Sequence, residues 1–401
     1  MQSRLALVVL LAGLTALGPF SLQILAPALP VIAEDLAVAP AAAQLLLSLS
    51  LVAMAAATLI WGPLSDQLGR RPMMLAGVAL AVIGSVVAAL APVLELVILG
   101  RLMQAGGAIA GMVLGRAIAQ DLFGREGAAA TIGQITAVMV AAPMLAPAIS
   151  GLLIESTGWR TIFWAVGLLA ILMLAAAFAM LRETAPERST TARSLGAVVH
   201  ETATSFRLLS CRRDFWSFAG YGVSSLGAFL FFVGAAPFVM AEAYGASPTV
   251  YGLWFIVLAL GYMAANLACG PVTRALGTIT TLRLGAILAL MATLVGLGFA
   301  LAGLVDPLTM IGPMLVQSLG AGLSVPNALA GATATVPERA GAASGLMGAS
   351  QFLGAAVTTQ IAGLLPHDSA LPLFLGMTLL LGAGTVLHLA LSRRSQRTAD
   401  A

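Results

Sequence analysis

The sequence contains no lysine and few charged residues. All 19 basic residues are arginines, 9% of the 401 residues are charged, and 60% are hydrophobic. A soluble domain carries about a quarter charged residues, so this chain has more apolar side chains than a water-soluble core can bury. Its mean hydropathy of +1.01 indicates a bilayer as the solvent. The net charge of +3 is too small to indicate a nucleic-acid partner.

Cysteine and histidine are also scarce. Cys211 and Cys269 set no disulfide framework and match no metal-ligand spacing. An enzyme would need a clustered nucleophile, a histidine-rich metal site or paired acids, and the three histidines are scattered. Without lysine there is no Gly-x4-Gly-Lys loop for ATP. We therefore expect neither an enzyme nor a bound cofactor or metal.

Long apolar segments recur along the chain. A membrane-spanning helix needs about 20 mostly apolar residues, and backbone groups inside a bilayer must be paired within helices. The first segment is longer than the apolar region of a signal peptide, so we expect it to be retained. The pattern predicts an all-α polytopic protein with twelve spans, at residues 5–30, 43–62, 73–91, 95–119, 130–153, 160–181, 215–240, 249–270, 280–302, 307–331, 341–365 and 371–391.

The distribution of arginines predicts the orientation. One set of loops is rich in arginine and the alternate set is acidic, with Arg160 as its single arginine. Arginine-rich short loops face the cytoplasm, and both termini fall on that side, which requires an even number of spans. The arginine side holds Arg4, Arg70, Arg71, Arg125, Arg274, Arg283, Arg339, Arg393, Arg394 and Arg397; the acidic side holds Glu34, Asp35, Glu155, Glu242, Asp306 and Asp368.

A polar segment separates two groups of six spans. Residues 182–214 predict a cytoplasmic linker, with a weak amphipathic helix at 195–209, between an N-terminal bundle (1–181) and a C-terminal bundle (215–401) with a short tail. The bundles share a repeat: GPLSDQLG at 62–69 is echoed by GPVTRALG at 270–277, and QAGGA at 104–108 by QSLGA at 317–321. Parallel six-helix repeats are one architecture of secondary transporters.

Three motifs resemble the major facilitator superfamily. Residues 62–71 (GPLSDQLGRR) resemble its signature after span two, Gly-x-x-x-Asp-Arg-x-Gly-Arg-Arg/Lys, with Gln67 at the usual arginine. RLMQAGGA at 101–108 is similar to its span-four arginine motif. APMLAPAISG at 142–151 is similar to the antiporter motif of drug exporters, with Ala146 and Ser150 in place of glycines.

Further stretches look most like one branch of that superfamily. RAIAQDLF at 116–123, the repeated Ala-Pro of 142–147 and GWRTIFW at 158–164 resemble the bicyclomycin/chloramphenicol-resistance (Bcr/CflA) branch. The resemblance covers nearly the whole chain and is stronger in the first half. It implies a proton-driven exporter of small, mostly apolar drugs across a bacterial inner membrane. We expect a monomer whose partners are a small-molecule substrate and the lipid bilayer.

The resemblance also implies a conformational latch. In the family, an aspartate and an arginine of the loop motif and an acid at the end of span four form a charge cluster that holds the two halves together when the cytoplasmic side is shut. Plain positive-inside topology explains the arginines but not Asp66 or the glycines. The predicted latch residues are Gly62, Asp66, Gly69, Arg70, Arg71 and Asp121.

Span four carries two arginines that topology does not require. An arginine inside the membrane costs roughly 2.5–3.5 kcal/mol, so it usually faces a polar cavity. Arg101 and Arg116 are about 22 Å and about 60° apart on a helix and share a face, although Arg116 is near enough to the end to reach the interface. Gly107, Gly111 and Gly115 form a stripe on another face, which predicts close approach of a neighbouring helix.

Spans five and one complete the predicted mechanism. Pro143, Pro147 and Gly151 form the antiporter-motif helix, in which each proline removes a helix hydrogen bond. In span one, Gln23 occupies the position where the family commonly has a titratable aspartate. Asp66 and Asp121 are alternative titrating groups, and a carrier without proton coupling is the alternative mechanism.

Polar, sulfur-bearing or aromatic residues near mid-span are the predicted substrate ligands, although each methionine or phenylalanine is also explained by packing. The absence of membrane-embedded acids favours neutral or anionic amphiphiles. A metabolite carrier for a sugar, nucleoside or organic acid is the second reading, and a receptor or scaffold without transport the third. The predicted ligands are Gln23, Arg101, Gln104, Met139, Phe231, Phe232, Asn266, Asn327 and Gln351.

Overall fold

The computed structural model describes residues 4–185, 204–304 and 306–399, without the side chains of 4, 124–133, 137 and 393–399. Within these ranges the chain is helical and has no strand. Most of the predicted linker lies outside the described residues, as do the side chains of Arg4, Arg125, Arg393, Arg394 and Arg397. Within its described part, residues 204–210 are helical.

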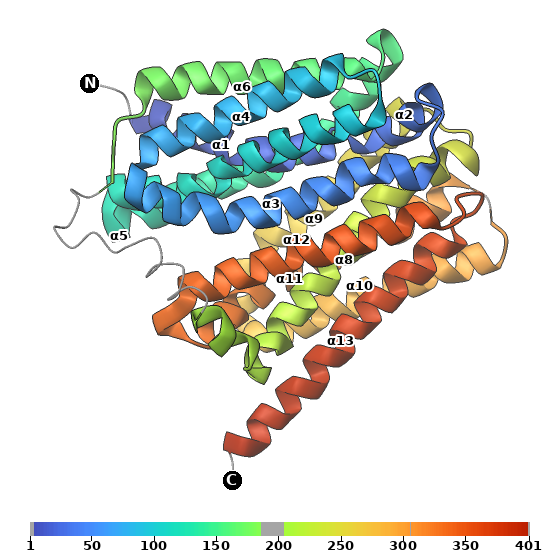
Figure 1. The fold of residues 1–401 in the computed structure, drawn as a ribbon. Coiled ribbons are helices and arrows are strands. Elements are labelled where there is room, and N and C mark those ends of the chain that lie inside the picture. Colours follow the sequence, from blue (N-terminus) through green and yellow to red (C-terminus); the bar gives the residue numbers. More distant parts are fainter. Residues whose placement is uncertain (1–3, 186–203, 305, 400–401) are drawn as a thin grey trace. The chain divides into compact units, whose positions relative to one another are not determined.

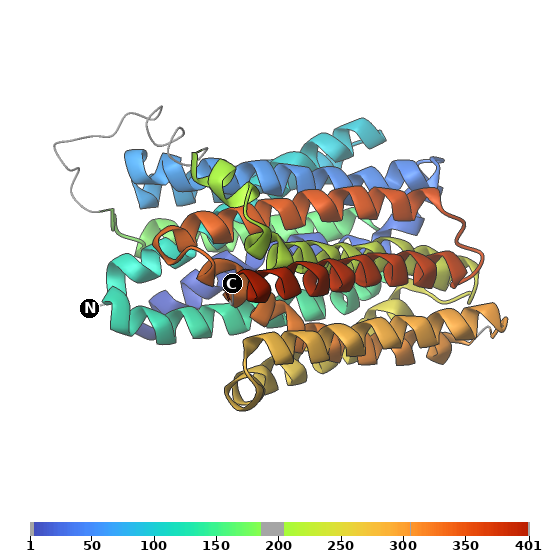
Figure 2. The ribbon, with the colours of Figure 1, turned by 90° about the horizontal axis from the view of Figure 1, so that it is seen from below.

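The chain divides into two compact units, Met1–His200 and Glu201–Ala401, each a bundle of long helices (Figures 1 and 2). The first unit contains α1 (Arg4–Gln23), a short 3-10 turn (Ala26–Ala28), α2 (Leu29–Asp35), α3 (Pro40–Leu68), α4 (Arg70–Leu90), α5 (Leu94–Thr157) and α6 (Arg160–Met180). The second contains α8 (Arg213–Glu242), α9 (Pro248–Leu276), α10 (Thr278–Leu301), α11 (Pro307–Ala334), α12 (Ala340–Leu364) and α13 (Leu371–Ala399).

Helix α5 contains two of the predicted spans. A straight helix of its 64 residues would be about 96 Å long. However, the Arg160 Nη2 just after α5 donates a hydrogen bond to the Ala91 carbonyl just before it, at 3.5 Å. The chain therefore reverses direction within α5. Leu94–Phe123 and Gln134–Thr157 each have the length and hydropathy of a membrane span.

The twelve-span prediction is confirmed. In the described part of the chain, eleven helical segments are long and apolar enough to cross a membrane, the first of which joins α1 and α2 as Leu5–Asp35. The twelfth is α12, which has 25 residues but contains Gln351, Gln360 and several glycines that lower its hydropathy. The all-α fold predicted from hydropathy is therefore present throughout the described residues.

The two units repeat the same close helix contact. A Cβ added to Gly77 in α4 would lie 3.0 Å from the Gly107 carbonyl oxygen in α5. A Cβ added to Gly285 in α10 would lie 2.5 Å from the Gly320 carbonyl oxygen in α11. The paired positions of the sequence repeat thus mark equivalent sites where only hydrogen fits between two backbones.

The glycine stripe of span four contacts two neighbours rather than one. Gly107 packs against α4, whereas Gly111 and Gly115 pack against Leu14 and Thr15 of α1. Four residues are about 400° of helix, so the stripe drifts by about 40° at each step and reaches a second groove.

Candidate functional site

Arg101 is the largest fully buried side chain of the described residues, with 1% of its surface exposed. Its Nη1 donates to the Ser21 carbonyl of α1 at 3.1 Å and to Oε1 of Gln104 one turn further along α5. The Gln104 Nε2 in turn donates to Ser85 Oγ of α4 at 2.7 Å. The arginine therefore lies at the centre of a polar network that joins α1, α4 and α5.

This network leaves part of the arginine unpaired. Nε and Nη2 of Arg101 have no hydrogen-bond partner among the described residues. The ion pairs found among those residues do not include Arg101. A buried cation without a counter-charge is costly and is usually retained for function. Arg101 therefore keeps three unpaired N–H groups, one on Nε and two on Nη2, that can donate to a carboxylate, a carbonyl or another acceptor.

Glutamines of the same unit also have unpaired, buried amide atoms, among them Gln67 Nε2 at the end of α3. Oε1 of Gln23 and both polar atoms of Gln44 lack partners among the described residues. Gln44 is fully buried in α3 and was not among the predicted ligands. Its signal in the sequence is that it is the single amide of the predicted span 43–62. Arg116, in contrast to Arg101, is partly exposed.

The sequence repeat shows that the fold itself does not require Arg101. Gln104 and Gly107 correspond to Gln317 and Gly320, and the same offset places Met314 opposite Arg101. Met314 is buried to the same degree, with 1% of its surface exposed. An apolar side chain therefore fills the equivalent position of the second unit, and the arginine is specific to the first.

The predicted ligands in the second unit belong to separate helix contacts. The buried Phe231 ring of α8 packs against Gly376 of α13. Asn327 of α11 donates to Cys269 Sγ of α9 at 3.1 Å. Gln351 of α12 donates to the Gly222 carbonyl of α8 at 3.2 Å. Phe232 is buried, and Asn266 and Met139 are partly exposed. The structure brings together Arg101 and Gln104, and the role of the whole set as substrate ligands stays a prediction.

Three charges of the predicted latch lie in contact at the junction of α3 and α4. Nη1 of Arg70 is 2.5 Å from Asp66 Oδ1 and its Nε is 3.3 Å from Asp121 Oδ2. Gly69 makes this turn with a φ of +103°, a conformation that favours glycine. Arg70 thus bridges the end of α3 to the end of the first half of α5. Gly62 lies within α3, one turn before Asp66.

Glu183 is a further member of this cluster that sequence reasoning missed. Its carboxylate accepts from the backbone N–H of Arg70 at 2.8 Å and of Arg71 at 3.3 Å, so it caps the N-terminus of α4. Burial raises the pKa of Glu183, but the N–H groups of Ala185, Arg70, Thr184 and Arg71 lower it further, and the net pKa is below its usual value. An anion is stabilised at a helix N-terminus. The signal was an acid directly after span six, on the arginine-rich side.

Arg71 points away from the cluster, although it belongs to the same motif. Its Nη2 donates to the Phe178 carbonyl of α6 at 2.9 Å, and its guanidinium lies 5.3 Å from the centre of the Phe178 ring. The side chain thus links α4 to α6 rather than pairing with Asp66 or Asp121.

The GWR stretch at 158–160 makes contacts with the end of α2. Trp159 Nε1 and Arg160 Nη1 both donate to Asp35 Oδ2, at 2.9 and 3.0 Å. The Arg160 guanidinium also stacks 4.1 Å from the Trp159 ring. The one arginine on the acidic side of the chain is therefore neutralised by an aspartate at the end of α2, and this motif has a structural explanation.

The antiporter-motif segment remains helical through Pro143 and Pro147, within α5. Pro147, Ser150 and Gly151 are buried, and the Ser150 hydroxyl has no partner among the described residues. A proline removes one backbone hydrogen bond without ending a membrane helix when neighbours cover the freed groups. The role of this segment in gating stays a prediction.

Comparison with known proteins covers nearly the whole chain. The sequence profile of the Major Facilitator Superfamily matches residues 11–235 and 217–401. The bicyclomycin resistance protein homolog of Haemophilus influenzae is 26% identical over 390 residues, 94% of this chain and 93% of that protein. The chloramphenicol resistance protein of Pseudomonas aeruginosa is 29% identical over 378 residues, 92% of this chain and 87% of that protein. The crystal structure of a D-xylose–proton symporter, 15% identical, matches with a TM-score of 0.74 over 96% of both chains and shows the shared fold.

Proposed function

This chain belongs to the major facilitator superfamily, a family of membrane transporters rather than enzymes, and on that premise we propose that it exports small apolar or amphiphilic compounds by alternating access. Its similarity to proteins named for bicyclomycin and chloramphenicol resistance supports a drug of the phenicol kind as substrate. The two-unit architecture supports movement of one unit against the other.

The buried, unpaired Arg101 is the observation that carries this proposal. A substrate with a carbonyl, nitro or carboxylate oxygen has the acceptor that the free Nε and Nη2 donors lack. Phenicols and other neutral or anionic amphiphiles have this chemistry. A cationic drug would meet an unneutralised positive charge, so we place such compounds outside the substrate class.

We further propose that export is driven by proton antiport across a bacterial inner membrane, with both termini in the cytoplasm. Gln23 cannot titrate, so the proton site lies elsewhere. Asp66 and Asp121 share Arg70 and are the acids whose charge the cluster depends on. Protonation of either weakens its pairing with Arg70. The cluster then stabilises one conformation only while both acids are charged, which couples proton uptake to the conformational change.

Arg101→Met tests the substrate role. Methionine is the residue found at the equivalent position of the second unit, and replacing a partly unpaired buried cation by an apolar side chain is often neutral for stability. We expect the variant to fold and to lose chloramphenicol transport in proteoliposomes at least tenfold, because about 1.4 kcal/mol or more of binding free energy is removed.

Met314→Leu is the matched control, and transport by it should equal that of the wild type. Unchanged transport by Arg101→Met would refute the role of Arg101. Flux of the wild type with and without an imposed pH gradient tests the coupling. Equal rates under both conditions would contradict proton antiport while leaving the substrate role intact.

A further inference from the structure

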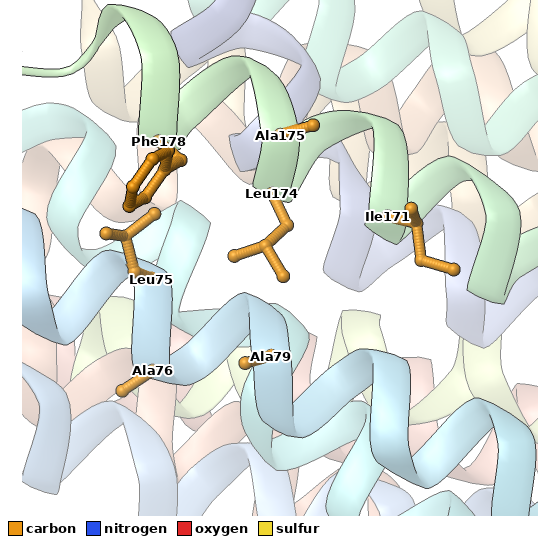
Figure 3. Close-up of a pocket in the computed structure, with 7 residues that line it drawn as sticks. All are labelled: Leu75, Ala76, Ala79, Ile171, Leu174, Ala175 and Phe178. Atoms are coloured by element: carbon orange, nitrogen blue, oxygen red, sulfur yellow. The ribbon is translucent and has the colours of Figure 1, made fainter.

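An apolar groove runs along the surface of the first unit between α4 and α6. Its volume is about 560 Å³, and Figure 3 shows side chains of both helices along it. Phe178 is 66% exposed, and Ile171 is 47% exposed. The lining residues are Leu75, Ala76 and Ala79 of α4 and Ile171, Leu174, Ala175 and Phe178 of α6.

The groove continues into a polar cavity at one end. This second cavity, of about 570 Å³, shares Leu75 and Phe178 with the first. It adds Arg71 and Pro72 from the start of α4, and Leu181, Arg182 and Glu183 from the chain after α6. The two cavities therefore form one elongated site with an apolar body and a charged mouth.

The mouth carries an excess of positive charge. The Glu183 carboxylate is occupied by four backbone N–H groups. Arg71 has a buried Nε without a partner, and neither Arg71 nor Arg182 belongs to an ion pair of the described residues. Arg182 is exposed, and Arg71 is half-buried with its Nη2 on the Phe178 carbonyl, so two guanidinium charges that no acid of the described residues neutralises lie beside an apolar groove.

We infer that this groove binds an anionic phospholipid, with its phosphate at Arg71 and Arg182 and an acyl chain along Leu75, Leu174 and Phe178. The site has a positively charged mouth joined to an apolar groove, and the lipid has a negatively charged headgroup joined to an apolar tail. Anionic lipids are attracted to basic residues at the cytoplasmic surface, which is the side predicted for these arginines. A free phosphate ion would leave the apolar groove unfilled.

The site differs from the proposed substrate site in residues and in chemistry. Arg101 is fully buried in α5, whereas this groove opens on the surface. The groove is lined by α4 residues other than Ser85, which belongs to the Arg101 network. Arg71 is adjacent to Arg70, so the bound lipid lies next to the charge cluster and ties α4 to α6 at that end.

Titration of the purified full-length protein with dioleoyl-phosphatidylglycerol, followed by native mass spectrometry, tests the inference. Dioleoyl-phosphatidylcholine is the neutral comparison lipid, and inorganic phosphate is the soluble anion. We expect tighter binding of the phosphatidylglycerol, no competition by phosphate, and a loss of apparent affinity of about fivefold for each of Arg71→Gln and Arg182→Gln.

Two further variants separate the groove from general surface charge. Ala175→Trp fills the apolar groove and should weaken binding of the lipid, whereas Leu172→Trp places the same ring at an exposed α6 position outside it. Arg274→Gln removes an exposed arginine from the corresponding junction of the second unit and should change nothing. Equal lipid affinity in the wild type, Arg182→Gln and Ala175→Trp would overturn the inference, as would displacement of the lipid by phosphate alone.

Discussion

At the junction of α3 and α4, Gly69 has a φ of +103°, and at the corresponding junction of α9 and α10, Gly277 has a φ of +82°. Both glycines end a Gly-Pro-x4-Leu-Gly stretch, and the helix that follows each one packs on its neighbour through a second glycine, Gly77 or Gly285. The backbone of the two junctions is thus the same, and it follows from the shared glycines.

The side chains at the two junctions differ. Asp66 and Arg70 of the first unit are ion-paired, and Arg70 also reaches Asp121. In the second unit the aspartate is replaced by Arg274, which is exposed and in no ion pair of the described residues. The turn forms without the charges, so they are not needed to fold the junction. Arg101 and Met314 also occupy equivalent positions, and the second bundle forms with an apolar residue where the first has the arginine.

The largest expected effect is a loss of stability at the glycine contact that both units share, between α4 and α5 and between α10 and α11. Gly77→Ala and Gly285→Ala should each lower the free energy of unfolding by about 1–3 kcal/mol, because the added methyl overpacks a site between two helices. Thermal unfolding of purified protein in detergent measures the loss. Gly298→Ala is the control, since nothing lies within 4 Å of its added Cβ, and alanine there should be neutral or stabilising. If Gly285→Ala left the unfolding temperature unchanged, the two helix contacts would not be equivalent.

A smaller effect is expected at the charge cluster. Asp66→Asn should reduce transport in proteoliposomes about fivefold, as a shift of ~1 kcal/mol between two conformations would. The unfolding temperature should change little, because a partly exposed ion pair contributes at most about 1 kcal/mol. Arg274→Gln, at the matched position of the second unit, should transport like the wild type. Equal activity of both variants would show that the cluster has no conformational role.

The smallest effect concerns the cap of α4. Glu183→Gln should destabilise the protein by about 0.3–1 kcal/mol at pH 7, because a charged carboxylate at a helix N-terminus becomes a neutral amide. The pKa of Glu183 is lowered in the folded state, so its contribution is present above the usual value of 4.5 and is lost as the pH falls below it. Unfolding temperatures of both proteins from pH 7 to pH 4 should converge in acid. Glu338→Gln, an exposed acid of the second unit, should follow the wild type throughout.

Much of the fold was predictable because the insertion of a segment into the bilayer depends on the summed hydropathy of its neighbouring residues. Segments of about 20 mostly apolar residues located the spans, and the predicted span 341–365 corresponds to α12 although its glutamines lower its hydropathy. Matched Gly and Gln residues predicted the repeat. The reversal inside α5 was predicted only as a loop, whereas the structure keeps this segment helical. The site was predictable in part. Arg101 was identified because an arginine inside a membrane span is costly and is usually retained for function, and Gln104 was identified because it belongs to the same motif.

The sequence by itself determined which segments enter the bilayer, where the chain turns at glycine, and which residues carry charge, because these properties belong to single residues and their near neighbours. Only the tertiary structure decided which groups meet. Glu183 caps a helix that starts 113 positions earlier, Arg101 bonds to a carbonyl 80 positions away, and Arg71 turns from its own motif to α6. Such partners are selected by the packing of whole helices, and no local pattern encodes them.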